Sequence, residues 1–306
     1  MDQNQKKSES FILEHQKDAF HQLIAIGNAC ISLLRNHLPI SLRFNTMLIG
    51  PSGSGKSHLA RMVAAELGIP FLPITVTSWI LLGSADRAGV RTWQIILSFL
   101  NKNAKAPGVM IFLDEIDKLA DCNTSWDIHL KCEVFNLLDF QIPSGVKDDA
   151  DDEINDDCMS RAQKVLSTRT FIVAAGAFQH IWEARACAKV GFQLQPTCTS
   201  PINLNILAKT LPRELTNRFR SKVIVLPQLT EADYHRMLQL TASRLPTFLM
   251  KTFLLMGERR IPAALNCQQG CRFVEELLLD VLMQEHDAIL DKTIERLRTE
   301  QSKIFP

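Results

Sequence analysis

The sequence lacks three features that mark specialised classes of protein. It has no run of about 18 apolar residues, the length that a membrane-spanning helix needs. Its polar start, MDQNQKKSES, is not followed by the apolar block of a secretory signal. The eight cysteines show no C-x-x-C spacing, so the sequence reveals neither a zinc site nor a disulfide framework. We therefore expect a cytoplasmic protein that neither spans a membrane nor is secreted.

An excess of charge of either sign is also missing. The 306 residues include 34 Lys and Arg against 33 Asp and Glu, which gives a formal net charge of +1. Proteins that bind nucleic acid usually carry a basic excess or a basic face that neutralises phosphates, so we do not expect a nucleic-acid partner. With 46% hydrophobic residues, the composition is that of a globular protein with a real core, and the length fits two domains.

Apolar runs alternate with segments of helical composition through about the first three quarters of the chain. Five such runs lie at residues 45–50, 70–76, 109–114, 170–175 and 223–226. Continuous apolar strands separated by helices argue for a parallel sheet that is covered on both faces. We therefore predict an α/β fold with a parallel sheet flanked by helices.

Composition also suggests where the domains begin and end. Residues 1–10 are polar and are expected to be disordered, and residues 11–227 contain all the apolar runs. Residues 228–306 have the pattern of helices, with Thr230 as the cap of the first. The acidic stretch at 147–157 has no apolar face and predicts a solvated loop. We predict a disordered N-terminus, a large α/β domain and a small helical domain with these boundaries.

The strongest motif is a phosphate-binding loop at residues 50–57. Its sequence, GPSGSGKS, satisfies G-x-x-x-x-G-K-[ST], and it lies between an apolar run and a helical segment, as the mechanism requires. Glycines let backbone N–H groups converge on phosphates, Lys56 would reach the β and γ phosphates, and the Ser57 hydroxyl would ligate Mg²⁺. We expect ATP and Mg²⁺ as ligands. The predicted nucleotide-binding residues are Gly50, Pro51, Ser52, Gly53, Ser54, Gly55, Lys56, Ser57, His58 and Asp114.

A pair of carboxylates, Asp114 and Glu115, follows the apolar run at 109–114. The carboxyl end of such a strand lies beside the phosphate loop in this architecture. Asp114 would hold Mg²⁺ together with Ser57, and Glu115 would polarise the attacking water as general base. Taken alone, the pair could equally be charges at a helix N-terminus. Its position downstream of a phosphate loop favours the catalytic interpretation.

These motifs resemble those of the AAA+ ATPases and, within them, of the branch of the ClpX and HslU protein unfoldases. Besides the phosphate loop and IFLDEIDKL at 111–119, the segment FIVAAGAFQ at 171–179 is similar to the sensor-1 strand of that branch. The resemblance runs from about residue 12 to the C-terminal helix. It implies a P-loop NTPase sheet, the AAA+ large domain, followed by a small helical lid domain.

Two arginines acquire roles from this resemblance. The segment at 211–219, LPRELTNRF, is similar to the one that ends in the arginine finger, which corresponds to Arg218. The segment at 268–272, QQGCR, resembles the start of the lid helix and maps sensor 2 to Arg272. Both guanidinium groups would stabilise charge on the γ-phosphate, and Arg218 would act on the adjacent subunit. The family analogy therefore implies a homo-oligomeric ring, by analogy a hexamer. Without the resemblance, each would be taken as a surface or helix-capping arginine.

The sequence also departs from the family pattern. Ala174, Ala175 and Gly176 occupy the strand end where AAA+ proteins commonly carry a polar sensor-1 side chain. The stretch corresponding to the pore loop is SWILLGSA at 78–85, in which Trp79 lies four residues before the glycine. This apolar stretch is either an exposed tip that a partner covers or a buried strand end. Val190-Gly191-Phe192 matches the peptidase-docking loop of ClpX in three residues only.

Two functions follow. The first is an ATP-driven ring that remodels, unfolds or disassembles a protein partner, with Glu115, Arg218 and Arg272 as catalytic residues. The alternative is an ATP-dependent assembly switch of a mobile-element or defence system, with slow hydrolysis and no threading. A DNA-associated loader is less favoured, because the charge is near neutral and no DNA-binding appendage is recognisable.

Overall fold

The computed structural model describes residues 12–32, 42–83, 90–119, 125–147, 156–179, 213–219 and 223–284. The chain divides into two compact units. The first consists of Met1–Ile12, Gln16–Pro51 and Lys56–Pro227. The second consists of Leu13–His15, Ser52–Gly55 and Gln228–Pro306. Among the described residues, no helix combines the length and the apolar character that crossing a membrane requires.

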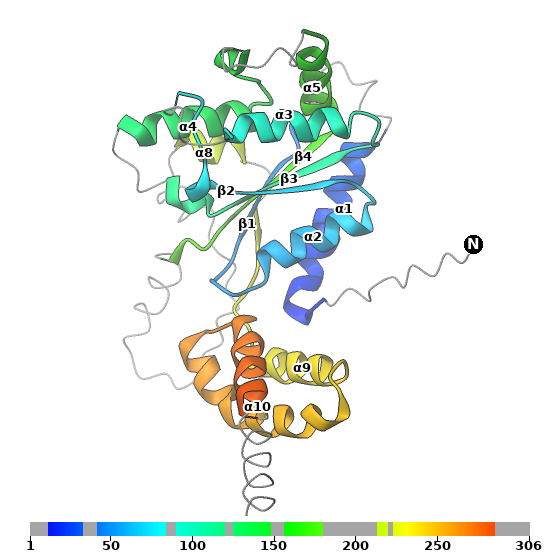
Figure 1. Cartoon of the computed structure of the whole chain (residues 1–306), viewed down its shortest axis with the longest axis vertical. Coiled ribbons are helices and arrows are strands. Elements are labelled where there is room, and N and C mark those ends of the chain that lie inside the picture. The colour runs from blue at the N-terminus through cyan, green and yellow to red at the C-terminus, as the bar shows by residue number, and fades with distance from the viewer. Residues whose placement is uncertain are drawn as a thin grey trace, which may run out of the picture. The chain divides into compact units, whose positions relative to one another are not determined.

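A five-stranded parallel sheet forms the centre of the first unit (Figure 1). Its strands lie in the order β2-β3-β4-β1-β5, and every neighbouring pair is parallel. The strands are β1 Asn45–Ile49, β2 Phe71–Thr75, β3 Val109–Asp114, β4 Thr170–Gly176 and β5 Val223–Val225. Each strand falls on one of the five apolar runs, and the predicted α/β fold is confirmed.

Helices cover both faces of this sheet, with α1 and α2 on one face and α3, α4 and α5 on the other (Figure 1). The helices of the first unit are α1 Lys17–Ile31, α2 Lys56–Glu66, α3 Thr92–Lys102, α4 Ser125–Leu138, α5 Asp156–Arg169 and α8 Arg213–Arg218. Short 3-10 turns in this unit are η3 Val76–Ser78, η4 Ile116–Leu119 and η5 Ser144–Lys147, and most of a further one, η1 Glu14–Gln16, belongs to the second unit.

The apolar strands are buried on both sides because successive side chains point to opposite faces of a sheet. On β3, Met110 and Phe112 pack in the cluster that includes α1 and α2. Ile111 and Leu113 pack in the other cluster, with side chains of α3, α4 and α5. This division explains why the central strands are apolar without alternation, as expected of a parallel sheet between two helical layers.

The strand order brings three functional segments to one edge of the sheet. β4 lies between β1 and β3 and is parallel to both. The loop after β1, the residues after β3 and the end of β4 therefore meet at the carboxyl edge. In open α/β sheets, ligands bind in the crevice outside this edge.

The part of the second unit that the structure describes after Gln228 is mainly helical. It contains α9 Glu231–Ala242, α10 Thr247–Cys267 and a further helix at 272–284. Thr230 caps α9 as expected: its hydroxyl accepts a hydrogen bond from the Asp233 N–H, and the Asp233 carboxylate accepts one from the Thr230 N–H. Such a capping box satisfies two backbone donors that the first turn leaves open.

Candidate nucleotide site

The loop of residues 50–55 joins β1 to α2, and its shape depends on two glycines. Gly53 and Gly55 have φ of 75° and 81°, a region that residues with a Cβ rarely adopt. The N–H of Gly50 donates to the Gly176 carbonyl at 3.3 Å, so this first glycine continues the sheet ladder to β4. Of the three glycines in the motif, Gly53 and Gly55 are therefore the ones that turn the loop.

The Lys56 ammonium is buried inside this loop. Its Nζ donates to the carbonyl oxygens of Gly50 at 2.7 Å and Pro51 at 2.9 Å. A buried cation is costly unless it is hydrogen-bonded, and these two carbonyls meet that need. The contacts hold a positive charge against the loop at the N-terminus of α2, where the helix dipole also favours an anion.

Ser57 and Asp114 meet across the carboxyl edge of the sheet. The Ser57 hydroxyl, in the first turn of α2, donates to Asp114 Oδ2 at 2.6 Å. A hydroxyl and a carboxylate are hard oxygen ligands, which Mg²⁺ prefers, and Mg²⁺ is usually held by one or two protein groups together with substrate phosphates. Because these two oxygens lie together beside the phosphate loop, the pair fits Mg²⁺ shared with a phosphate. The described residues contain no group of three or more His, Cys, Asp or Glu side chains placed to hold a metal.

Glu115 has an unusual backbone conformation and a partner that the sequence did not reveal. Its φ is 59°, a left-handed value that costs about 1–3 kcal/mol for a residue with a side chain. Its Oε2 accepts a hydrogen bond from the Thr77 hydroxyl at 2.6 Å. Thr77, in η3 after β2, therefore orients the carboxylate of Glu115. A single threonine after a strand has no spacing pattern, so only the fold could identify it.

The end of β4 lacks a polar side chain, as the sequence indicated, but a carboxylate lies against it. A Cβ added to Gly176 would lie 2.9 Å from Asp117 Oδ1 and 2.6 Å from the ring of Phe178. The N–H of Phe178 donates to Asp117 Oδ2 at 3.3 Å. Glycine is required at this strand end because Asp117 of η4 and the Phe178 ring occupy the space beside it.

The tip of the phosphate loop, Ser52–Gly55, belongs to the second unit, in which it contacts the turn before helix 272–284. The N–H of Cys271 donates to the Gly53 carbonyl at 2.8 Å. A Cβ on Gly53 would lie only 2.6 Å from the Gln269 carbonyl oxygen.

Burial, together with the negative charges of Glu275 and Asp233, raises the pKa of the Cys271 thiol to about 11. The thiol is therefore protonated at neutral pH and is a poor metal ligand.

The other predicted site residues are placed as follows. His58 is exposed on the first turn of α2, and Arg218 is the last residue of α8. Arg272 is exposed at the start of helix 272–284. A cation at a helix N-terminus opposes the helix dipole, so the local structure does not explain Arg272. Val190-Gly191-Phe192 lies outside the described residues.

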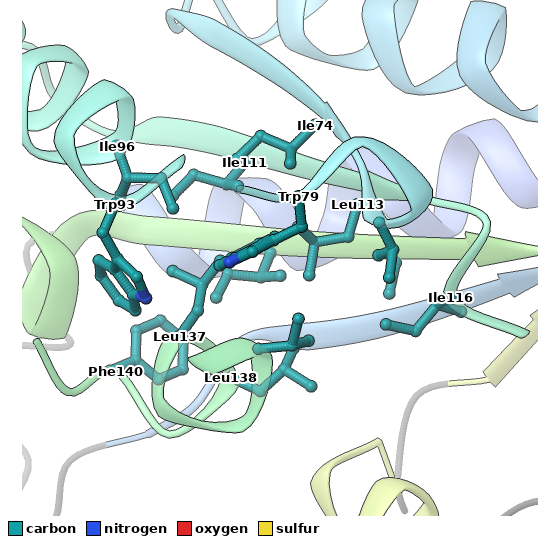
Figure 2. Close-up of a cluster of buried hydrophobic side chains, with 14 of the residues drawn as sticks. Ile74, Trp79, Trp93, Ile96, Ile111, Leu113, Ile116, Leu137, Leu138 and Phe140 are labelled. Atoms are coloured by element: carbon teal, nitrogen blue, oxygen red, sulfur yellow. The ribbon is translucent and has the colours of Figure 1, made fainter. Parts of the chain in front are cut away.

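Trp79 is buried, which decides between the two interpretations of the stretch at 78–85. Its side chain lies in the cluster of buried apolar residues between the sheet and α3 and α4 (Figure 2). The indole Nε1–H donates to Glu133 Oε2 at 2.9 Å, and the Leu82 N–H donates to Glu133 Oε1 at 2.8 Å. The Trp93 ring packs edge-on against it. Trp79 is a core residue and not the exposed tip of a pore loop.

Replacing Trp79 with alanine is therefore expected to reduce the free energy of unfolding by about 3–5 kcal/mol, as for other large core side chains. The loss has two causes: a cavity, and a buried Glu133 carboxylate without its indole donor. Urea unfolding measures it, with the exposed neighbour Ser78→Ala as control, which should stay within about 0.5 kcal/mol of wild type. A Trp79→Ala variant as stable as wild type would contradict the core assignment.

Comparison with known proteins places the site in a recognised family. Residues 46–181 match the family described as ATPase family associated with various cellular activities (AAA). This segment contains β1 except its first residue, β2 to β4, the phosphate loop, and the carboxylates of Asp114 and Glu115.

Individual relatives are more distant. A ClpX of Azotobacter vinelandii, an ATP-binding subunit of the ATP-dependent Clp protease, is 26% identical over 64% of this chain and 48% of its own length. A ClpX of Borrelia duttonii is 36% identical over 25% of this chain and 18% of its own. A chloroplastic ATP-dependent zinc metalloprotease FTSH of Capsicum annuum is 39% identical over 23% and 10%. The chain thus spans less than half the length of each of these relatives.

Proposed function

Because this chain is an AAA+ ATPase with a resemblance to ClpX, we propose that its copies form a ring, by family analogy a hexamer. This ring would hydrolyse ATP at the subunit interfaces and use the energy to remodel, unfold or disassemble a protein partner. The observation that supports the site most strongly is the contact between Ser57 and Asp114 beside the phosphate loop. It brings together, from α2 and the end of β3, the hydroxyl and the carboxylate that would share Mg²⁺ with a bound nucleotide.

The binding step rests on the phosphate loop. The N–H groups at the start of α2 and the Lys56 ammonium would receive the β and γ phosphates. Ser57 and Asp114 would hold Mg²⁺, which neutralises charge on the phosphates during transfer. Lys56 lies inside the loop, where the two backbone carbonyls of Gly50 and Pro51 hold its ammonium group beside the N-terminus of α2.

The chemical step would be the in-line attack of water on the γ-phosphate. Glu115, oriented by the Thr77 hydroxyl, would accept a proton from that water as it attacks. Arg218 from the neighbouring subunit and Arg272 from the same chain would stabilise the charge on the transferred group. In this arrangement each site is complete only after assembly, which couples turnover to ring formation.

The assembly switch remains a second candidate, and the burial of Trp79 favours it. An unfoldase grips its substrate with an exposed aromatic residue of the pore loop, and here the corresponding tryptophan is a core side chain. A ring without this grip can still use ATP to control its own assembly. The two functions differ in whether a protein substrate accelerates turnover.

Steady-state ATPase measurements with and without a permanently unfolded protein distinguish them. For a remodeller we expect severalfold faster turnover with the unfolded protein, and none in Glu115→Gln. Mass photometry of Glu115→Gln with ATP should show rings under the same conditions. Negligible turnover with ATP-dependent rings would instead identify the switch. A chain that stays monomeric with ATP at every concentration would contradict both.

A further inference from the structure

We propose that Asp139 is a positioning residue for the arginine finger: it holds the Arg218 side chain in a fixed orientation within its own subunit, ready to be presented to the neighbour. This inference rests on the proposed role of Arg218. It starts from contacts within the first unit, between α8 and the C-terminal end of α4.

Asp139 holds the guanidinium by one edge. Arg218 Nε and Nη2 donate to Asp139 Oδ2 at 3.1 and 2.6 Å, and Arg218 Nη1 donates to the Glu214 carbonyl at 2.8 Å. The ring of Phe135 lies under the group, with 4.2 Å from the guanidinium carbon to the ring centroid. Two hydrogen-bonded sides and a stacked face define the orientation of a planar group almost completely.

The same contacts leave part of the guanidinium able to bind a further anion. An arginine side chain has five N–H donors, and the three hydrogen bonds to Asp139 and Glu214 use three of them. One N–H on each terminal nitrogen lies outside these bonds. The side chain is 20% exposed, so solvent reaches it. Two donors on adjacent nitrogens match the oxygens of a phosphoryl group.

The location of Asp139 is unfavourable for its own helix. It directly follows Leu138, the last residue of α4, and its N–H still bonds to the Phe135 carbonyl. A carboxylate beside the last carbonyls of a helix is repelled by the helix dipole. Here Arg43 and Arg218 offset the charge, with Arg43 Nη1 2.7 Å from Asp139 Oδ1. The Asp139 carboxylate does not stabilise α4, so its presence is better explained by its two arginine partners than by the stability of the helix.

Arg43 provides a matched control, because it pairs with the other oxygen of the same carboxylate. Its side chain is 54% exposed, so the ion pair that it forms contributes little. Arg43→Ala leaves both Asp139 bonds to Arg218 in place. It should therefore keep wild-type turnover, whereas Asp139→Asn removes the charge that fixes the finger and keeps the shape of the side chain.

The test measures kcat and KM for ATP in wild type, Asp139→Asn, Arg43→Ala and Arg218→Ala. We expect Asp139→Asn to lower kcat by about tenfold to a hundredfold, the scale expected when a catalytic group is misplaced by about 1 Å, with KM unchanged. Unchanged KM separates loss of positioning from a damaged nucleotide pocket. If Asp139→Asn turns over ATP at least as fast as wild type while Arg218→Ala is inactive, the inference about Asp139 fails and the proposed role of Arg218 stands. Full activity of Arg218→Ala would instead remove the proposed finger itself.

Mixed rings exclude a merely structural effect of Asp139. Asp139→Asn subunits keep intact nucleotide pockets and have misplaced fingers, whereas Lys56→Ala subunits have intact fingers and defective pockets. In mixed rings, some Asp139→Asn pockets would receive an intact finger from a Lys56→Ala neighbour. ATP turnover per intact pocket should therefore be severalfold higher in mixed rings than in rings of Asp139→Asn alone. If Asp139→Asn only damaged the fold of its own subunit, mixing would give no increase, and the inference would fail.

Discussion

Lys56→Ala is expected to abolish measurable nucleotide binding. The ammonium is the only charged group of the loop at residues 50–55 and its junction with α2, and it lies buried against the Gly50 and Pro51 carbonyls. Removing one partner of a buried charge pair typically costs about 2–5 kcal/mol, which corresponds to roughly 30-fold to several-thousand-fold weaker binding. Titration of the variant with a fluorescent ATP analogue and Mg²⁺ measures the change.

The control for this variant is Lys102→Ala, which removes an exposed lysine at the end of α3. It should bind ATP as wild type does. Thermal unfolding of both variants without nucleotide separates a lost charge from a lost fold. ATP affinity in Lys56→Ala within a few-fold of wild type would mean that the loop does not hold the phosphates.

Arg218→Ala is expected to leave ATP affinity nearly intact and to reduce kcat by at least about 1,000-fold, the lower end of the effect of arginine fingers. The residue lies at the end of α8, and the proposed role places its action on the γ-phosphate bound by the next subunit. Loss of the guanidinium therefore removes stabilisation of the transition state without removing a contact to ground-state ATP in its own pocket.

Two further measurements help to interpret a loss of turnover in Arg218→Ala. Single-turnover kinetics separate the chemical step from product release, and urea unfolding shows how much the lost contact to Asp139 destabilises the subunit. Arg218→Lys should be almost as slow as alanine, because an ammonium cannot keep the planar, two-sided contact to Asp139 while it reaches a phosphate. Wild-type turnover in Arg218→Ala would show that the finger assignment is wrong.

The sequence predicted the sheet and the phosphate loop because both depend on local patterns. Continuous apolar runs become buried parallel strands, and β1 and β3 begin where the runs at 45–50 and 109–114 begin. The motif GPSGSGKS carries its own conformation in its glycines. The match of residues 46–181 to the AAA family covers the phosphate loop and four of the five strands, all but β5.

Two helices form although part of their sequence argues against a helix. The acidic stretch at 147–157 predicts a solvated loop, yet α5 begins at Asp156, where acidic residues suit the positive end of the helix dipole. Its buried Ala162, Val165 and Leu166 follow helical spacing, a signal that was present in the sequence. In α10, Pro262 lies inside the helix, and proline normally argues for a break.

Contacts between distant residues could not be predicted from a single sequence. Trp79 bonds to Glu133, Glu115 to Thr77, and Arg218 to Asp139, at separations of 54, 38 and 79 residues. The apolar stretch around Trp79 was equally compatible with an exposed tip and with a buried strand end. The fold decides this because Glu133 on α4 offers the indole a buried acceptor.

A mixing experiment tests most directly whether adjoining copies share one ATPase site. Lys56→Ala and Arg218→Ala, each inactive alone, are combined in equal amounts with ATP and Mg²⁺, and phosphate release is followed. Intact pockets of Arg218→Ala subunits would then receive fingers from Lys56→Ala neighbours, and we predict that roughly a quarter of wild-type turnover returns, because random mixing pairs a good pocket with a good finger at about one interface in four. A mixture as inactive as its two components, despite ring assembly, would contradict the account.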